Sequence, residues 1–123
     1  MRKLFWPEAC FRSRRRNWRV YLVDRMPVGH RDSVGLCFPS RSVIYVLAGL
    51  RRGQLFKTLG HELLHALIGN AKQDGVHKAS EEYYVGLAEP VVWKVFGQFG
   101  ARPPALPAGL RAFRRACRKA AKK

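Results

Sequence analysis

The stretch KTLGHELLHALIGN, residues 57–70, places His61 and His65 four positions apart, with Glu62 directly after the first histidine. Apolar residues recur around them at helical spacing, so we predict a helix over residues 54–68. Residues i and i+4 share one face of a helix, and both imidazoles can therefore reach a single ion. An ordinary amphipathic surface helix would show the same polar face. Further residues of the chain are therefore needed to decide between a metal site and an ordinary surface helix.

Two histidines at this spacing, with a glutamate after the first, are typical of a catalytic zinc site. Zinc accepts imidazole nitrogens and, in catalytic sites, takes three protein ligands and a water. Glu62 is predicted to accept a proton from that water as general base. His61 and His65 are thus two predicted zinc ligands, and a third ligand must come from another segment.

A second predicted helix, over residues 80–99, offers that ligand. Its apolar face contains Glu81, and a carboxylate among apolar side chains is costly unless it is paired or binds a metal. We therefore expect Glu81 to complete the site. Glu82 and Glu89 flank the same face, where solvation or salt bridging is expected, and Glu82 stays an alternative ligand. His77, in the preceding loop, is a further alternative.

Upstream of the helices, β-branched and aromatic residues predict strands at 17–25, 34–38 and 42–47, the last two joined by a short turn. Gly69 and Asn70 are a predicted end for the first helix. Strands followed by helices indicate an α+β fold, with a short antiparallel sheet packed on the two helices.

The chain divides by composition. Residues 1–99 form the predicted domain, in which 70–78 is a polar loop and Pro90 kinks the second helix. Residues 100–109 are a Pro/Gly linker, and residues 110–123 are a basic tail with helix-forming composition.

The net charge of +16 is unevenly distributed. Residues 1–20 hold seven Arg/Lys and one Glu, residues 102–123 hold eight and no acid, and residues 21–101 hold nine against seven acids. Two cationic ends on a nearly neutral body favour contact with a polyanion, and nucleic acid is the predicted partner. The alternative is dispersed, solvated charge, because no aromatic stacking motif accompanies the arginines.

Cysteine usage and hydropathy bound the remaining possibilities. The three cysteines, Cys10, Cys37 and Cys117, are far apart and form no CxxC pair, so neither disulfides nor a thiolate zinc site is expected. No run of about 18 apolar residues could span a membrane. The basic N-terminus lacks the apolar region of a secretory signal, and a cytoplasmic location is expected.

The segments SVIYVLAGLRRGQLFKTLGHELLHALIG (42–69) and SEEYYVGLAEPV (80–91) resemble the small gluzincin-type metallopeptidases, allied to the ImmA/IrrE-like peptidases of phages and prokaryotes. The resemblance covers about residues 40–98. It implies a zincin-like, zinc-dependent peptidase that acts on a protein or peptide, with ligands His61, His65 and Glu81 and with Glu62 as base. The EEYY sequence departs from the family pattern and leaves Glu81 and Glu82 both open.

Two other interpretations follow from the same residues. SprT-like proteases also carry HExxH and basic additions, but their third ligand is usually a histidine, which only His77 could supply here. From a different class, the chain could be a nucleic-acid-binding protein with an inactive or structural zincin core. In the peptidase interpretation, the strand at 42–47 is expected to line the cleft and hold an extended substrate by main-chain pairing.

Overall fold

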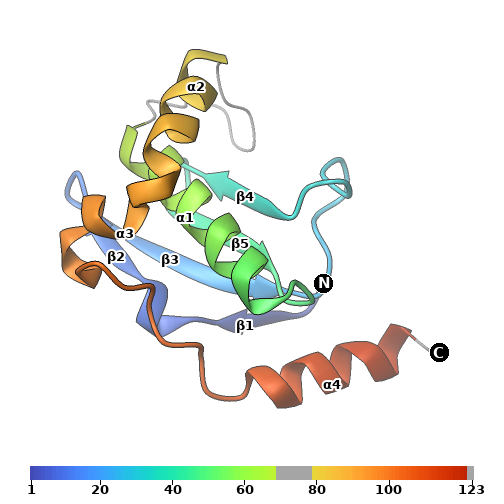
Figure 1. The fold of residues 1–123 in the computed structure, drawn as a ribbon. Coiled ribbons are helices and arrows are strands. Elements are labelled where there is room, and N and C mark those ends of the chain that lie inside the picture. Colours follow the sequence, from blue (N-terminus) through green and yellow to red (C-terminus); the bar gives the residue numbers. More distant parts are fainter. Residues whose placement is uncertain (69–78, 122–123) are drawn as a thin grey trace.

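The computed structural model describes residues 1–68 and 79–121 and has the predicted α+β class (Figure 1). The predicted helix end at Gly69 and Asn70, the polar loop and His77 lie outside the described residues. Within the described ranges, every helix is too short or too polar to cross a lipid bilayer. The elements are β1 (Lys3–Phe5), η1 (Pro7–Ala9), β2 (Phe11–Ser13), β3 (Arg16–Val23), β4 (Gly35–Phe38), β5 (Val43–Leu47), α1 (Arg52–Ile68), α2 (Ala79–Ala88), η2 (Glu89–Val91), α3 (Val92–Val95), η3 (Gly97–Phe99) and α4 (Leu110–Ala121).

The sheet is mixed, which corrects the expected antiparallel sheet. Its order is β1-β3-β5-β4, with β2 also paired to β3, and β3 and β5 run parallel. Residues 24–34 carry the chain to the far edge before β4 begins. β4 and β5 then form the predicted antiparallel hairpin, and β5 returns beside β3 in the same direction. β1 and β2 were not predicted, because three residues each are too few to show an alternating pattern.

Helix α1 packs across one face of the sheet, where the main core lies (Figure 1). Leu55, Leu59 and Leu63 recur at helical spacing and are completely buried against the apolar side chains of β3 and β5. Gly60 permits the close approach of α3, since a Cβ atom there would lie 2.9 Å from Val92 Cγ1. The leucine face therefore fixes the rotation of α1, and with it the direction in which its polar residues point.

The second predicted helix is broken rather than kinked. α2 ends at Ala88, a 3-10 turn with Pro90 follows, and α3 begins at Val92. Proline lacks a backbone N–H and clashes with the preceding turn, which stops the helix. Val85 and Val92, seven residues apart, are buried on the two sides of the break, whereas Val91 and Val95 are exposed. The apolar face predicted for residues 80–99 is therefore buried only along its centre, and Tyr84 at its edge is exposed.

The basic C-terminal segment is docked on the domain. Arg114 donates hydrogen bonds from Nε to the carbonyl of Ala48, at 2.7 Å, and from Nη2 to the carbonyl of Leu50, at 3.0 Å. The indole Nε1 of Trp6 donates to the carbonyl of Ala105, at 2.7 Å, and holds the segment that precedes α4. Figure 1 shows α4 at the end of the molecule opposite α2. Cys10, Cys37 and Cys117 form no disulfide bond with one another.

Candidate metal centre

The two histidines of α1 turn their rings toward each other. Their Nε2 atoms lie 3.1 Å apart, and the side chain of His65 is completely buried while that of His61 is partly exposed. Two nitrogens bound tetrahedrally to one zinc-sized ion would lie about 3.3 Å apart. The pair therefore has the separation of two ligands that share an ion, and His65 does not lie on a solvated helix face.

Glu82 of α2 completes a cluster of three. Its Oε1 lies 2.9 Å from His65 Nε2, and its Oε2 lies 3.5 Å from His61 Nε2. One ligand atom from each of these three residues lies within 4.8 Å of the others, close enough to hold a metal ion. The structure thus brings Glu82, the alternative, and not the expected Glu81, to the Nε2 side of the histidines.

Glu81 contacts the opposite nitrogen of the same histidine. Its Oε2 lies 2.6 Å from His65 Nδ1, and its side chain is 10% exposed. Pairing with His65 therefore supplies the partner that a carboxylate on this apolar face needs. A carboxylate at Nδ1 favours the tautomer with a proton there, which leaves the Nε2 lone pair directed at the cluster.

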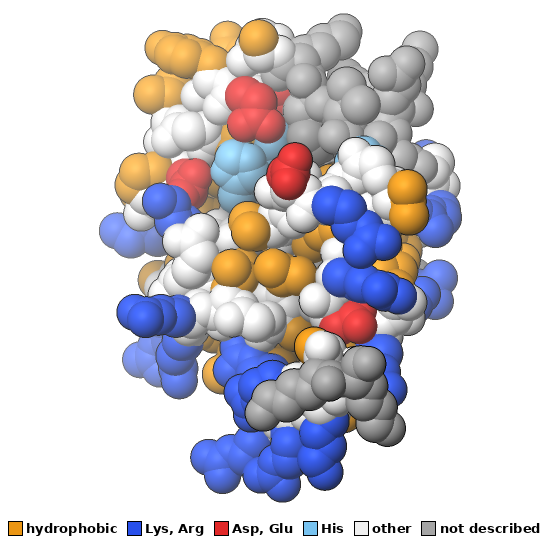
Figure 2. All heavy atoms as spheres, turned by 90° about the vertical axis from the view of Figure 1, so that its right-hand side faces the viewer, with side chains coloured by type: hydrophobic (Ala, Val, Ile, Leu, Met, Phe, Trp, Pro, Cys, Tyr) orange, Lys and Arg blue, Asp and Glu red, His pale blue; other side chains and the backbone are white. Residues whose placement is uncertain are grey.

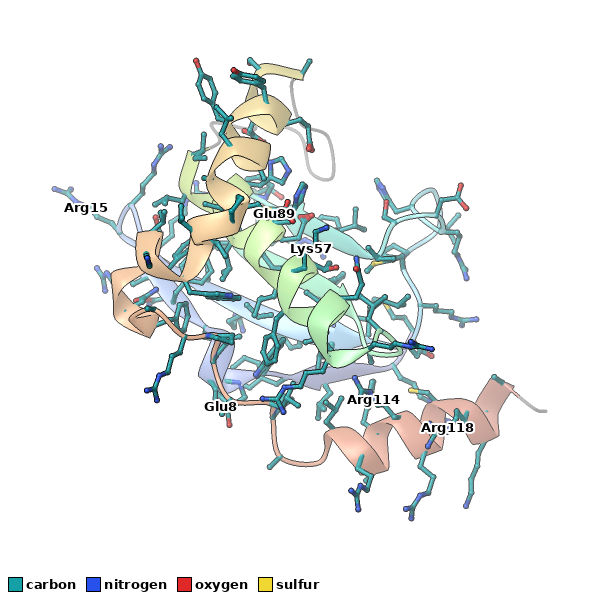
Figure 3. The ribbon with its side chains drawn as sticks, viewed as in Figure 1. Glu8, Arg15, Lys57, Glu89, Arg114 and Arg118 are labelled. Carbon is teal, nitrogen blue, oxygen red and sulfur yellow. The ribbon has the colours of Figure 1, made fainter. Side chains whose placement is uncertain are left out.

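His61 has an equivalent partner in Glu89, whose Oε2 lies 3.3 Å from His61 Nδ1. The other oxygen of Glu89 is 3.8 Å from Nζ of Lys57, and Figure 3 shows these two side chains close together above α1. Glu89 was expected only to be solvated or salt-bridged. Its position seven residues after Glu82, about two helical turns, was the signal that both carboxylates face the same side.

Glu62 is a buried carboxylate beside this cluster. It is 6% exposed, and its Oε2 has no hydrogen-bond partner among the described residues. Burial first, and then the carboxylates of Glu82 and Glu81, raise the pKa of Glu62 to about 8 from its ordinary 4.5. An unpartnered buried carboxylate is costly. A cation and its water would supply the missing partner, so the donor set fits a bound metal ion.

A cleft of about 360 Å³ opens in front of the cluster, lined by the start of β4, by α1 and by the glutamates of α2 and η2. At Gly35 of β4, a Cβ atom would lie 2.6 Å from Thr58 Cγ2 and 3.0 Å from Glu62 Cγ. Only glycine lets the strand pass this close to Glu62. The strand that lines the cleft is therefore the edge strand β4, which corrects the expectation for residues 42–47, since β5 lies between β3 and β4.

The site end of the molecule is also where acidic side chains gather. In Figure 2, red carboxylates lie beside the pale blue histidine in the upper half, and blue basic side chains predominate below. No protein-family model matches the chain, and neither a curated protein nor a solved structure matches it significantly.

Proposed function

We propose that this protein is a zinc-dependent metallopeptidase with a zincin-like core, in which His61, His65 and Glu82 bind the zinc. The observation that carries the proposal is the pair of Nε2 atoms 3.1 Å apart, with Glu82 Oε1 2.9 Å from one of them. The carboxylates of Glu81 and Glu89 behind the two rings support it, because metal-binding histidines usually donate their other N–H to such a group.

Zinc is the ion that two imidazoles and one carboxylate suit best when hydrolysis is the reaction. A bound zinc ion lowers the pKa of its water to about 7 and polarises the carbonyl of the scissile bond. The chain itself supplies the base, since Glu62 lines the same cleft as His61 and Glu82. Glu62 accepts the proton of the attacking water and returns it to the leaving amine nitrogen.

The peptide substrate is held by the edge strand β4. Within the described strands β4 pairs only with β5, and its other edge is the one to which an extended chain would add as a further strand. Gly35 places this edge against Glu62. A peptide bound along β4 therefore passes the base and the metal ligands in one cleft, which favours peptide-bond hydrolysis over chemistry on a small molecule.

The test is zinc content and peptide cleavage in the parent and in Glu62→Gln. We expect about one zinc per chain in both proteins, measured by mass spectrometry of the metal after purification without chelator. Cleavage of a library of quenched fluorescent peptides should fall about 10²- to 10⁴-fold in Glu62→Gln, because the general base is lost. Glu8→Gln, which changes an exposed glutamate far from the cleft, is the matched control and should cleave like the parent (Figure 3).

Two results would contradict the proposal. Parent protein without bound zinc, and unable to take it up from solution, would exclude the metal centre. Zinc-loaded Glu62→Gln that cleaves as fast as the parent would exclude the role of Glu62.

A further inference from the structure

We propose that the outward face of α4 binds the phosphate backbone of double-stranded nucleic acid, without reading its sequence. The surface consists of Arg111, Arg115, Arg118 and Lys119, all exposed, and we call it the α4 basic face. The proposal concerns a surface outside the metal centre and does not depend on peptidase activity.

The spacing of the α4 basic face suits a row of phosphates. Arg111, Arg115 and Arg118 follow the i, i+4, i+7 pattern and lie on one side of the helix. At a rise of 1.5 Å per residue the row is about 10 Å long. One strand of B-DNA carries a phosphate about every 3.4 Å along its axis. The row can therefore contact about three successive phosphates.

The helix is held in place before any ligand binds. Its inner side carries the buried Leu110 and the half-buried Phe113, and Arg114 is hydrogen-bonded to two carbonyls of the β5–α1 connection. A docked helix loses less conformational entropy on binding than a free basic tail. The arginine row is thus a preformed surface.

No structural role accounts for these charges. Among the described residues, no carboxylate forms an ion pair with Arg111, Arg115 or Arg118. Arginines four positions apart on a helix repel each other, so the row slightly destabilises α4. Contact with a polyanion would relieve this repulsion, and the release of counterions would favour binding.

The composition of the surface selects the kind of polyanion. None of the exposed large hydrophobic side chains belongs to α4, which argues against insertion into a membrane surface. No exposed aromatic ring on α4 is available to stack on unpaired bases, which argues against a single-strand binder. A duplex, which presents only its backbone to such a surface, is the best match.

The position of α4 keeps the cleft accessible. α4 lies at the end of the molecule opposite α2 (Figure 1), and the carboxylates gathered near the histidines repel phosphates (Figure 2). A duplex on the α4 basic face would therefore leave the metal centre open. A peptidase with this arrangement would be localised on nucleic acid while it acts on a protein.

The test compares two triple variants with the same change in net charge. One is Arg111→Gln/Arg115→Gln/Arg118→Gln, and the control is Arg12→Gln/Arg31→Gln/Arg102→Gln, which removes three exposed arginines outside α4. Binding to a fluorescein-labelled 20-base-pair DNA is measured by anisotropy at several salt concentrations. The α4 variant should bind at least about tenfold more weakly, and its slope of log K against log salt should flatten by about 2.7, or 0.9 for each lost contact.

The control variant should keep a slope within about one unit of the parent. Equal losses in the two variants would overturn the proposal, because the binding would then follow net charge alone. It would also be overturned by tighter binding of the parent to a 20-base oligo-dT, or to phosphatidylserine vesicles, than to the duplex. Circular dichroism should be unchanged in both variants, since all six side chains are exposed.

Discussion

The two ends of this molecule use charge in opposite ways. At the α2 end, four of the eight acidic residues of the chain surround two histidines, and Glu62 and Glu81 are largely buried there. At the α4 end, the outward basic side chains are exposed and have no acidic partner among the described residues. Buried charges need nearby partners, whereas exposed charges stay solvated without them.

This difference indicates two kinds of function. The buried carboxylate of Glu62, one oxygen of which has no hydrogen-bond partner among the described residues, favours a site that takes a cation. Arginines that are exposed on a docked helix favour a surface that takes an extended anion. The function of each end can therefore be tested by substitutions that remove its charge. The largest effects are expected for the metal ligands and the smallest for the stability contributed by the arginines of α4.

The largest effect is expected on zinc affinity, when Glu82 is replaced. Glu82→Gln removes one of three proposed ligands, and we expect zinc affinity to fall at least about 1000-fold, measured by competition with a chelating dye. Glu81→Gln is the matched comparison at the adjacent position. Because Glu81 Oε2 contacts Nδ1 of His65 and not its Nε2, loss of this carboxylate should reduce zinc affinity about 10- to 100-fold.

The relative size of these two losses decides the ligand. A larger loss in Glu81→Gln than in Glu82→Gln would show that Glu81 binds the ion, as first expected from the sequence. Equal losses would show that the two carboxylates act as one unit, and our division into ligand and orienting residue would be wrong.

A smaller effect is expected on the stability of the metal-free protein. The pKa of Glu62 is raised to about 8, so between pH 4.5 and 8 the unfolded chain releases a proton that the folded protein keeps. Stability should therefore decrease as pH rises through this window, by a few kcal/mol at about 1.4 kcal/mol per unit. The groups that face Glu62 include Glu81 and Glu82, which strengthen the effect.

Glu62→Gln cannot ionise and should lack this part of the pH dependence. The measurement is urea unfolding of chelator-treated protein at pH 5, 6.5 and 8, with the difference between parent and variant taken at each pH. A difference that does not change with pH would mean that Glu62 is ionised throughout, in contact with water or with a cationic group.

The sequence was sufficient to predict those features that depend on the spacing of neighbouring residues. Leu55, Leu59 and Leu63 repeat at helical spacing, so α1 was predicted to within two residues of its start and at its described end. The β4–β5 hairpin followed from two apolar strands around a short turn. His61, Glu62 and His65 were selected by spacing alone, and the structure brings the two histidines together.

The sequence was insufficient to predict contacts between segments that are distant along the chain. Glu81 and Glu82 are adjacent, and which of them reaches Nε2 depends on the rotation of α2 relative to α1. The burial of Glu62 depends on the approach of β4 at Gly35, which is far away in sequence. The helix predicted over residues 80–99 was also treated as continuous, whereas a 3-10 turn that contains Pro90 separates α2 from α3.

The next prediction concerns the close contact between β4 and α1 at Gly35. In Gly35→Ala the new methyl group would lie 2.6 Å from Thr58 Cγ2, so the strand or Glu62 must shift. A displacement of about 1 Å in such a site can reduce kcat/KM about 100-fold. Zinc content should be unchanged, because no ligand is altered. Gly49→Ala, where a Cβ atom meets nothing within 4 Å, should be as active as the parent.

The smallest effects are expected on the free energy of unfolding when arginines of α4 are replaced. The hydrogen-bonded Arg114 should contribute more to it than the exposed arginines of the α4 basic face. Arg114→Gln loses the hydrogen bonds to the carbonyls of Ala48 and Leu50, and should lower the free energy of unfolding by about 1–2 kcal/mol. Replacing Arg111, Arg115 and Arg118 together by Gln should change it by less than about 0.5 kcal/mol, because relief of repulsion offsets the lost contacts. Urea unfolding measures both. A triple variant destabilised as much as Arg114→Gln would mean that the outward arginines hold the helix in place, and their exposure could no longer be attributed to a ligand.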